Sequence, residues 1–268
     1  MARVFVTGSA DGLGRLAARR LVEAGHEVVL HARSEARARE ALREVAGARA
    51  ALIGDLASVG ETRGLAEQAN AAGPFDAVIH NAGIYLQPRR ETDDGVEQVF
   101  AVHVLAPYVL TALVPARRLV YVSSGMHRGG RPELEDLGWR HRRWSASQAY
   151  SDSKLLLVAL AFAVARRWPG VRSNAIDPGW VPTKMGGAGA PDDLEDGVRT
   201  QVWLAVSEDP AAQVSGRYLH HLRPHAAHPA ASDRRVQEAL LEVCEQRSGI
   251  AFPVAPAGEA VGASPSSG

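Results

Sequence analysis

The sequence predicts an α/β fold in one domain, a doubly wound parallel sheet of six to seven strands with helices on both faces. Short β-rich runs alternate with longer helical patterns along most of the 268 residues, as in successive βαβ units. Several of the runs are apolar nearly throughout, which is typical of strands covered on both faces. No internal repeat and no convincing linker interrupts the pattern, so we expect a single domain over residues 1–250.

The expected elements follow one another in a regular order. The strands lie at 3–8, 27–32, 48–54, 75–81, 118–124 and 171–177, and "SGRYL" (215–219) is a candidate seventh. The helices fill the intervals near 13–25, 34–46, 58–72, 91–114 and 145–168. Residues 251–268 are Pro/Gly/Ser-rich and poor in large apolar groups, so we expect a disordered tail there.

Composition argues against several functional classes. Lys plus Arg and Asp plus Glu are equal at 30 each, so no overall field favours nucleic acid or an anionic membrane. The longest uncharged apolar run, "LLLVALAFAVA", has 11 residues, fewer than the roughly 20 that span a bilayer. The first residues enter a strand directly, without a signal peptide, and the one cysteine, Cys244, is interpreted as packing in a late helix. We expect a soluble, cytoplasmic protein.

A glycine-rich turn follows the first strand in "TGSADGLG" (7–14). Gly8, Gly12 and Gly14 stand where the strand gives way to a helix. Glycines at this point allow a tight turn and let backbone N–H groups approach a pyrophosphate at the helix N-terminus. The spacing T-G-x-x-x-G-x-G differs from the commoner G-x-G-x-x-G. Its place in the first βα unit favours a Rossmann-type nucleotide site.

The end of the second strand bears on the choice of nucleotide. An NAD site usually has an acid there for the ribose 2′-hydroxyl, whereas an Arg accommodates the 2′-phosphate of NADP. The sequence "VVLHARSEAR" has His31 and Ala32, then Arg33. We therefore favour NADP(H) over NAD(H), although a solvated Arg33 starting the next helix is an alternative. Asp11, within the glycine turn, argues for NAD if its carboxylate lies near that phosphate.

Tyr150 and Lys154 stand four residues apart at the start of an apolar helical segment, so they share one helix face. A free tyrosine has a pKa of about 10, and a neighbouring ammonium favours the phenolate and lowers that pKa. The pair is therefore a candidate proton-transfer unit. An amphipathic helix with an incidental Tyr and a snorkelling Lys is the alternative.

Three further stretches join these motifs: "HNAG" (80–83), "VYVSSG" (120–125) and "DPGWVPT" (177–183). In this order, with the glycine turn and Y-x-x-x-K, the chain resembles the short-chain dehydrogenase/reductase family over residues 3 to about 220. The pattern is most similar to the branch that contains retinol dehydrogenase-like enzymes.

The resemblance implies roles for particular residues. Tyr150 would be the general acid or base, Lys154 would also hold the nicotinamide ribose, and Ser124 would donate a hydrogen bond to the substrate oxygen, with Ser123 not excluded. Asp55 would meet the adenine, Pro178 and Gly179 would shape the wall beside the nicotinamide, and Thr183 would bond near its amide. The full cofactor set is Thr7, Gly8, Gly12, Leu13, Gly14, Arg33, Asp55, Leu56, Asn81, Ala82, Gly83, Tyr150, Lys154, Pro178, Gly179, Val181 and Thr183.

Two departures from the family pattern leave alternatives open. His103 stands where relatives carry an asparagine that helps to hold a water in a proton relay to the lysine. It is interpreted either as a relay substitute or as a packed histidine. Ser124 and Tyr150 are 26 apart, about twice the family interval. Trp139 and Trp144 in the extra segment either pack on a substrate or anchor a solvated loop.

Two other segments have simpler interpretations. The glycine-rich, then acidic segment 186–197 falls where relatives often carry a mobile substrate lid. The histidines of "YLHHLRPHAAHP" lack acidic or cysteine partners at sensible spacing, so we predict no metal site.

The leading hypothesis is an NADP(H)-dependent oxidoreductase that interconverts an alcohol and a ketone or aldehyde. A catalytically silent NADP(H)-binding sensor is the alternative from another class. A nucleotide-sugar epimerase or dehydratase is disfavoured because about 50 residues remain after residue 220. The expected partner is a small carbonyl or alcohol substrate. The apolar face of helix 145–168 would form the interface of a homodimer or homotetramer, unless that face packs wholly against the sheet.

Overall fold

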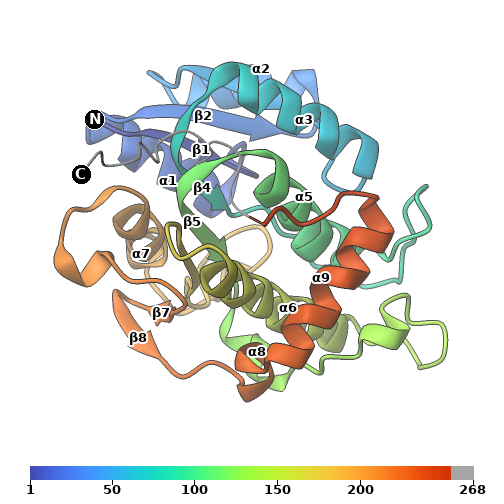
Figure 1. Cartoon of the computed structure of the whole chain (residues 1–268). Helices are drawn as coiled ribbons and strands as arrows, with labels where there is room; N and C mark the ends of the chain where they lie inside the picture. Colours follow the sequence, from blue (N-terminus) through green and yellow to red (C-terminus); the bar gives the residue numbers. More distant parts are fainter. Residues whose placement is uncertain (255–268) are drawn as a thin grey trace, which may run out of the picture.

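The strands of the computed structural model, which describes residues 1–254, pair in the order β3-β2-β1-β4-β5-β6-β7-β8 (Figure 1). Every neighbouring pair is parallel except β7 and β8, which are antiparallel. The order reverses between β1 and β4, which creates the switch point where doubly wound sheets bind ligands. The strands are β1 (Arg3–Val6), β2 (Glu27–Ala32), β3 (Ala50–Ile53), β4 (Phe75–His80), β5 (Ala116–Val122), β6 (Arg172–Asp177), β7 (Tyr218–His220) and β8 (Arg223–His225).

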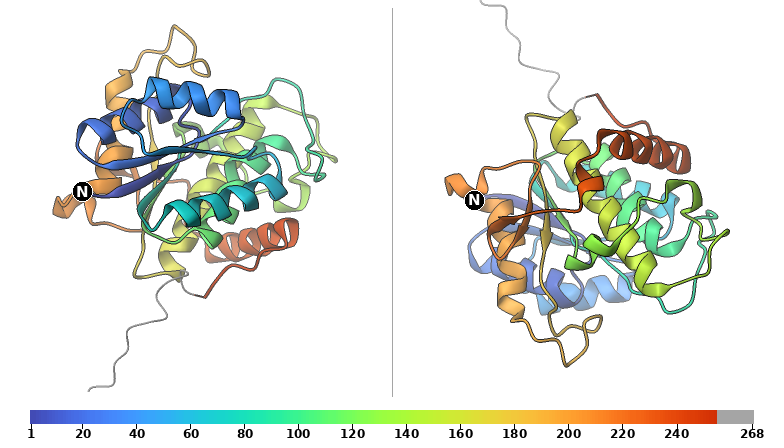
Figure 2. Two further views of the ribbon diagram at one scale, coloured as in Figure 1. Left: turned by 90° about the horizontal axis from the view of Figure 1, so that it is seen from above. Right: turned by 90° about the horizontal axis from the view of Figure 1, so that it is seen from below.

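Helices cover both faces of the sheet, which confirms the predicted fold class (Figure 2). One layer contains α1 (Gly12–Glu23), α2 (Glu35–Glu44) and α7 (Leu194–Val206), and the other contains α3 (Val59–Ala72), α5 (Ala106–Leu113) and α6 (Ala146–Arg167). The remaining elements are α4 (Gln98–Phe100), η1 (Ala101–Leu105), η2 (Gly125–Gly129), η3 (Leu134–Asp136), η4 (Pro210–Ala212), α8 (Pro229–Ser232) and α9 (Arg234–Ser248).

Helix α6 forms the centre of the second layer. It packs against β5 and β6 on one side and against α8 and α9 on the other, as Figure 2 shows. Among the described residues it is the one helix long and apolar enough to cross a membrane, but 78% of its most apolar stretch is buried inside the fold. Its apolar side chains are therefore consumed by packing within the chain.

Two element predictions need correction. The sheet has eight strands rather than six or seven, because β7 turns back into β8 through His221 and Leu222, which both have positive φ. The predicted helix 91–114 begins only at Gln98, because residues 91–97 form a turn closed by a bridge between Glu91 and Glu97. Strand β8 contains a proline, and the turn at 91–97 is rich in Thr, Asp and Gly. Neither segment therefore produces a regular hydrophobic pattern in the sequence.

The end of the described chain packs against the second layer. Phe252 stacks on Trp168 with ring centroids 4.7 Å apart, and the Trp168 indole N–H donates to the carbonyl of Pro253 at 3.0 Å. The predicted tail begins at residue 251, so Phe252 and Pro253 lie in a part of it that packs on the fold, while Ala251 and Val254 are exposed and 255–268 lie outside the described residues. Cys244 is fully buried in α9, and burial raises its thiol pKa, in keeping with a packing role.

Candidate active site

The predicted motifs meet at one edge of the sheet. The glycine turn follows β1, "HNAG" closes β4, Ser124 follows β5, and "DPGWVPT" leaves β6, while the first turns of α6 carry Tyr150 and Lys154. Because these strands are parallel, their carboxyl ends lie side by side. The topology therefore assembles one site from segments that are far apart in the sequence.

The glycine turn is locked to the segment after β4. The Thr7 hydroxyl oxygen accepts the N–H groups of Asn81 and Ala82 at 3.0 and 3.1 Å. The Asn81 amide in turn donates to the carbonyls of Thr7 and Gly8 at 3.0 and 3.3 Å. A Cβ on Gly8 would lie 2.7 Å from the Ala82 Cα, and one on Gly14 would lie 2.3 Å from the Asn81 amide nitrogen. Two of the three glycines are thus required by this internal packing.

His31 is a site residue that the sequence analysis missed. Its Nδ1 accepts the N–H of Gly8 at 2.9 Å, and its Nε2–H then donates to the carbonyl of Gly54 at 2.8 Å. Burial lowers its pKa, so the ring is neutral. A histidine inside the apolar run "EVVLHA" needs a hydrogen-bond partner for its ring. The structure shows that this partner is the glycine turn.

Asp11, whose charge argues for NAD, is surrounded by cationic protein groups. Its carboxylate accepts a hydrogen bond from Lys184, accepts the N–H of Gly12 at 2.9 Å, and lies 3.5 Å from Arg37 Nη2. The hydrogen bond from Lys184 is the largest influence on its pKa, which is lowered. Two cations therefore compensate this carboxylate, while Arg33 is exposed just after β2. Arg37, four residues beyond Arg33 in α2, is a second basic group that the sequence analysis did not single out.

A hollow of about 250 Å³ lies beside the glycine turn and brings together two predicted cofactor residues, Gly12 and Thr183. Gly12 has φ +51°, and its Cβ position lies 3.7 Å from the Thr183 methyl group. Arg15, Arg19 and Lys184 also line the hollow, so it carries several basic side chains. A basic hollow at a helix N-terminus suits the phosphates of a dinucleotide.

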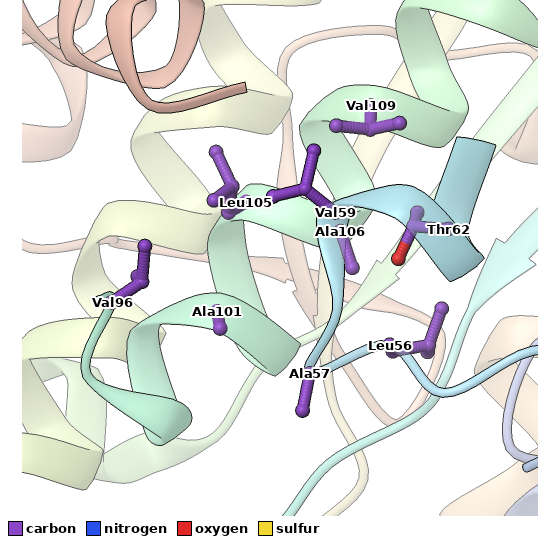
Figure 3. A pocket seen from close by; sticks show the side chains of 9 residues that line it. All are labelled: Leu56, Ala57, Val59, Thr62, Val96, Ala101, Leu105, Ala106 and Val109. Atoms are coloured by element: carbon purple, nitrogen blue, oxygen red, sulfur yellow. The ribbon is translucent and has the colours of Figure 1, made fainter. Parts of the chain in front are cut away.

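Asp55 and Leu56 follow β3, at the predicted adenine end. Asp55 accepts the N–H of Ala57 at 2.9 Å and so shapes the turn into α3. Leu56 is buried and lines a small apolar hollow with residues of α3, η1 and α5 (Figure 3). That hollow has no room for a water molecule, so it is a packing feature rather than a binding site.

Tyr150 and Lys154 lie one turn apart in α6, as predicted. The Lys154 ammonium is buried, donates to the carbonyl of Val122 at 2.8 Å and lies 5.5 Å from the centre of the Tyr150 ring. The Ser124 hydroxyl lies near enough to the Tyr150 hydroxyl to lower the pKa of Tyr150. Ser123 instead donates to the carbonyl of Lys154 at 3.0 Å and is buried, so Ser124 is the serine at the site.

The pKa of Tyr150 differs from the sequence-based expectation. Burial raises it to about 12, outweighing the lowering effect of the Ser124 hydrogen bond, and Asp177 and Tyr85 raise it further. Burial also lowers the pKa of Lys154 to about 7, which removes part of the positive charge that the expectation relied on. Near neutral pH the phenol in this structure is therefore protonated and suited to donate a proton.

His103 has both ring nitrogens occupied by protein groups. Its Nε2 accepts the N–H of Ile84 at 2.8 Å, so its proton is on Nδ1, 2.8 Å from the Ser153 hydroxyl oxygen. The Ser153 hydroxyl in turn donates a hydrogen bond to the carbonyl of Tyr150 at 2.8 Å. Burial, and then the charge of Lys154, lower the pKa of His103 well below its usual value. These contacts favour the packed histidine over the proton relay.

The segment after β6 folds back on itself. Gly179 has φ +81°, and a Cβ there would lie 2.5 Å from the Asp192 carboxylate, which accepts the Trp180 N–H at 2.6 Å. The Thr183 hydroxyl oxygen accepts the N–H of Gly186 at 3.1 Å. Pro178 precedes this turn, and Val181 is buried. The mobility predicted for 186–197 stays a prediction, and its last residues form the start of α7.

The extra segment between Ser124 and Tyr150 is anchored by its tryptophans. Trp139 is buried under the guanidinium of Arg142 at 3.7 Å, and the Trp144 indole N–H donates to the carbonyl of Gln87 at 2.7 Å. These contacts support the anchoring alternative. Tyr85 is the aromatic residue near the chemistry, with its ring 5.5 Å from that of Tyr150. Its position two residues after "NAG" was the available signal.

Among residues 1–254, no group of three or more His, Cys, Asp or Glu side chains is arranged to hold a metal ion. His220 and His221 stack on each other with ring centroids 3.9 Å apart.

Comparison with known proteins agrees with the resemblance. The family profile described as enoyl-(acyl carrier protein) reductase matches residues 8–213. An uncharacterized oxidoreductase, AN7799 of Emericella nidulans, is 44% identical over 94% of this chain and 99% of its own length. The short-chain dehydrogenase chyC of Penicillium rubens is 42% identical over 94% of this chain and its full length. Retinol dehydrogenase 14 of Mus musculus is 31% identical over 92% of this chain and 86% of its own.

Two solved structures extend the comparison. An uncharacterized protein from Mycobacterium paratuberculosis has 30% identity and a TM-score of 0.82, covering 94% of this chain and 95% of its own. A blue fluorescent protein from a metagenomic library, solved in complex with NADPH, has 25% identity and a TM-score of 0.66, covering 82% and 95%.

Proposed function

The chain belongs to the short-chain dehydrogenase/reductase family of oxidoreductases, and we propose that it interconverts an alcohol and a ketone or aldehyde with NADP(H). One observation carries the proposal. The half-buried phenol of Tyr150 lies close enough to Ser124 for that hydroxyl to lower its pKa, and it lies one helical turn from the buried ammonium of Lys154, which is 5.5 Å from the ring centre.

Ser124, Tyr150 and Lys154 each have a separate role in the proposed reaction. The nicotinamide cofactor supplies or accepts the hydride. In the reducing direction Ser124 donates a hydrogen bond to the carbonyl oxygen, and Tyr150 gives its phenolic proton to that oxygen. Because burial raises the pKa of Tyr150, the proton that the reduction needs is present on the phenol at neutral pH. Lys154 supports the phenolate left behind, since a nearby cation stabilises it.

The choice of NADP(H) rests on the basic groups at the end of β2. Arg33 is exposed there, and Arg37 contacts the glycine turn by donating to the carbonyl of Ala10 at 3.1 Å. Asp11, which could have repelled a 2′-phosphate, is compensated by Lys184 and Arg37. The structural relative solved with NADPH adds support by likeness.

The test separates cofactor binding from chemistry. Titration of the purified chain should show tighter binding of NADPH than of NADH, and Arg33→Ala should weaken NADPH binding while changing NADH binding little. Tyr150→Phe should abolish reduction of carbonyl substrates without loss of NADPH binding. Full activity of Tyr150→Phe would contradict the proposed role of Tyr150, and equal affinity for both nucleotides would contradict the role of Arg33.

A silent NADP(H)-binding sensor is the second candidate, because His103 is held by protein groups where relatives have a relay asparagine. It predicts cofactor-dependent binding of a partner and no turnover by the wild-type chain on a broad carbonyl panel. Turnover that depends on Tyr150 would exclude it.

A further inference from the structure

Ser124 is the one residue of the proposed catalytic set that lies outside α6, and a short 3-10 helix fixes its position. This helix, η2, begins directly after Ser124. The Ser124 Oγ accepts the N–H of Met126 at 3.2 Å. Because that oxygen already accepts a backbone donor, its own hydrogen points away from the turn and is free to be donated. The orientation of Ser124 as a hydrogen-bond donor therefore depends on η2.

Helix η2 is packed tightly between β6 and α6. A Cβ on Gly125, at its start, would lie 3.0 Å from a carboxylate oxygen of Asp177 at the end of β6. A Cβ on Gly130, directly after η2, would lie 2.5 Å from the carbonyl oxygen of Ser151 in α6. The turn therefore has little freedom to move relative to the helix that carries Tyr150.

His127 is the fully buried side chain of η2, and both of its ring nitrogens form hydrogen bonds. Its Nε2 accepts the backbone N–H of His228 at 3.2 Å. Because that nitrogen is an acceptor, the ring proton is on Nδ1, which donates to the carbonyl of Ser124 at 2.8 Å. Burial lowers the pKa of His127, in keeping with this neutral form. His127 thus links Ser124 to a segment 101 residues further along the chain.

The partner segment is itself held in place. His228 caps α8, since its Nδ1 accepts the N–H of Ala230 at 3.1 Å. Helix α8 packs against α6 (Figure 1). The ring of His127 also lies against Tyr218 of β7, with centroids 4.3 Å apart. The His127 ring is therefore fixed between α8 and the sheet.

We propose that His127 is a positioning residue for Ser124: its Nδ1–H fixes the Ser124 backbone so that the Ser124 hydroxyl donates to the substrate oxygen. Such a donor stabilises the charge that develops on that oxygen only while it stays in place, and a misplacement of about 1 Å can cost roughly 100-fold in rate. The anchor of this contact, His228, lies beyond the residues 8–213 that match the family profile. This inference rests on the proposed function and adds a positioning residue to that same site.

Two substitutions separate the contacts of His127. In His127→Gln the longer amide reaches the position of Nε2 and keeps an acceptor for the His228 N–H, but loses the donor to Ser124. In His127→Asn the shorter amide keeps a donor at the position of Nδ1 and loses the contact with His228. With NADPH and the best substrate of a panel of aryl and alkyl ketones and aldehydes, His127→Gln should lower kcat roughly 10- to 100-fold. His127→Asn should keep kcat within about threefold of wild type and lower the thermal midpoint instead.

The controls show whether the effect acts through Ser124. NADPH affinity should be unchanged in both variants. Tyr218→Phe keeps the ring beside His127 and should leave kcat at the wild-type value. In a Ser124→Ala background, His127→Gln should change kcat by less than about threefold, because residues that act as one unit are not additive. A general loss of packing would instead lower kcat by the same factor in both backgrounds.

The outcomes are distinguishable. Wild-type kcat in His127→Gln, an equal loss with and without Ser124, or a kcat in His127→Asn as low as in Ser124→Ala would each overturn the positioning role and leave the proposed function intact. The last comparison decides the question even if His127→Gln does not fold. A wild-type chain that binds NADPH but reduces no member of the panel would overturn the proposed function, and this inference with it.

Discussion

Replacing His103 with alanine tests whether this residue is a structural element or a proton relay. The side chain joins three parts of the site: the N–H of Ile84 after β4, the π-helix η1 that carries it, and Ser153 in α6. Its ring also packs edge-on against Tyr150, with centroids 5.4 Å apart. The substitution removes all of these contacts from a fully buried position.

The magnitude follows from the contacts. The Ile84 N–H loses its acceptor, which costs about 1–3 kcal/mol for a buried donor, and the lost bond to Ser153 adds about 1 kcal/mol. The cavity left by the imidazole adds a further term, so we expect a loss of roughly 3–5 kcal/mol in the free energy of unfolding. For a chain of this size that lowers the thermal midpoint by roughly 10 °C.

The assay is thermal and urea unfolding of wild type and His103→Ala, followed by circular dichroism, with kcat measured well below the midpoint. His103→Asn is the matched control, because a shorter amide keeps one donor and one acceptor and should lose less stability. A structural histidine predicts a large stability loss and a moderate loss of activity. Unchanged stability combined with loss of turnover in His103→Ala would refute this reasoning and restore the relay.

Two further predictions concern pH and the cofactor turn. The pKa values of His31, His80 and His103 are all lowered by burial, so below pH about 6.5 the unfolded chain binds protons that the folded chain does not. Stability should therefore fall from pH 7 to 5.5, and His80, whose pKa is lowered to about 3, accounts for about 1.2 kcal/mol of that loss. Urea unfolding across this range checks it, and a flat profile would contradict the neutral assignment. Gly14→Ala should weaken NADPH binding at least tenfold, because the added Cβ would displace the Asn81 amide. Titration measures the NADPH affinity of the variant. Wild-type affinity would contradict the prediction and show that the turn can adjust.

Local patterns in the sequence determined the fold class and supplied the list of candidate site residues. The spacing of apolar runs predicted β1 to β7, and the glycine turn and the Tyr150/Lys154 pair were visible as short motifs. Parallel strands end at one edge, so motifs at strand ends could be expected to meet. The start of the helix near residue 98 and the strand β8 were missed, because turn residues and a proline interrupt the periodicity there.

Only the tertiary structure decided how the site residues are paired and charged. Asp11 is compensated by Lys184, which is 173 residues away in the chain, and no local pattern predicts that contact. Burial, rather than the neighbouring lysine, sets the direction of the Tyr150 pKa shift. The partners of His103 likewise depend on which distant segments pack around it. Desolvation and long-range hydrogen bonds are properties of the packed chain. Sequence motifs therefore identify the candidate residues, whereas the fold determines their pKa values and hydrogen-bond partners.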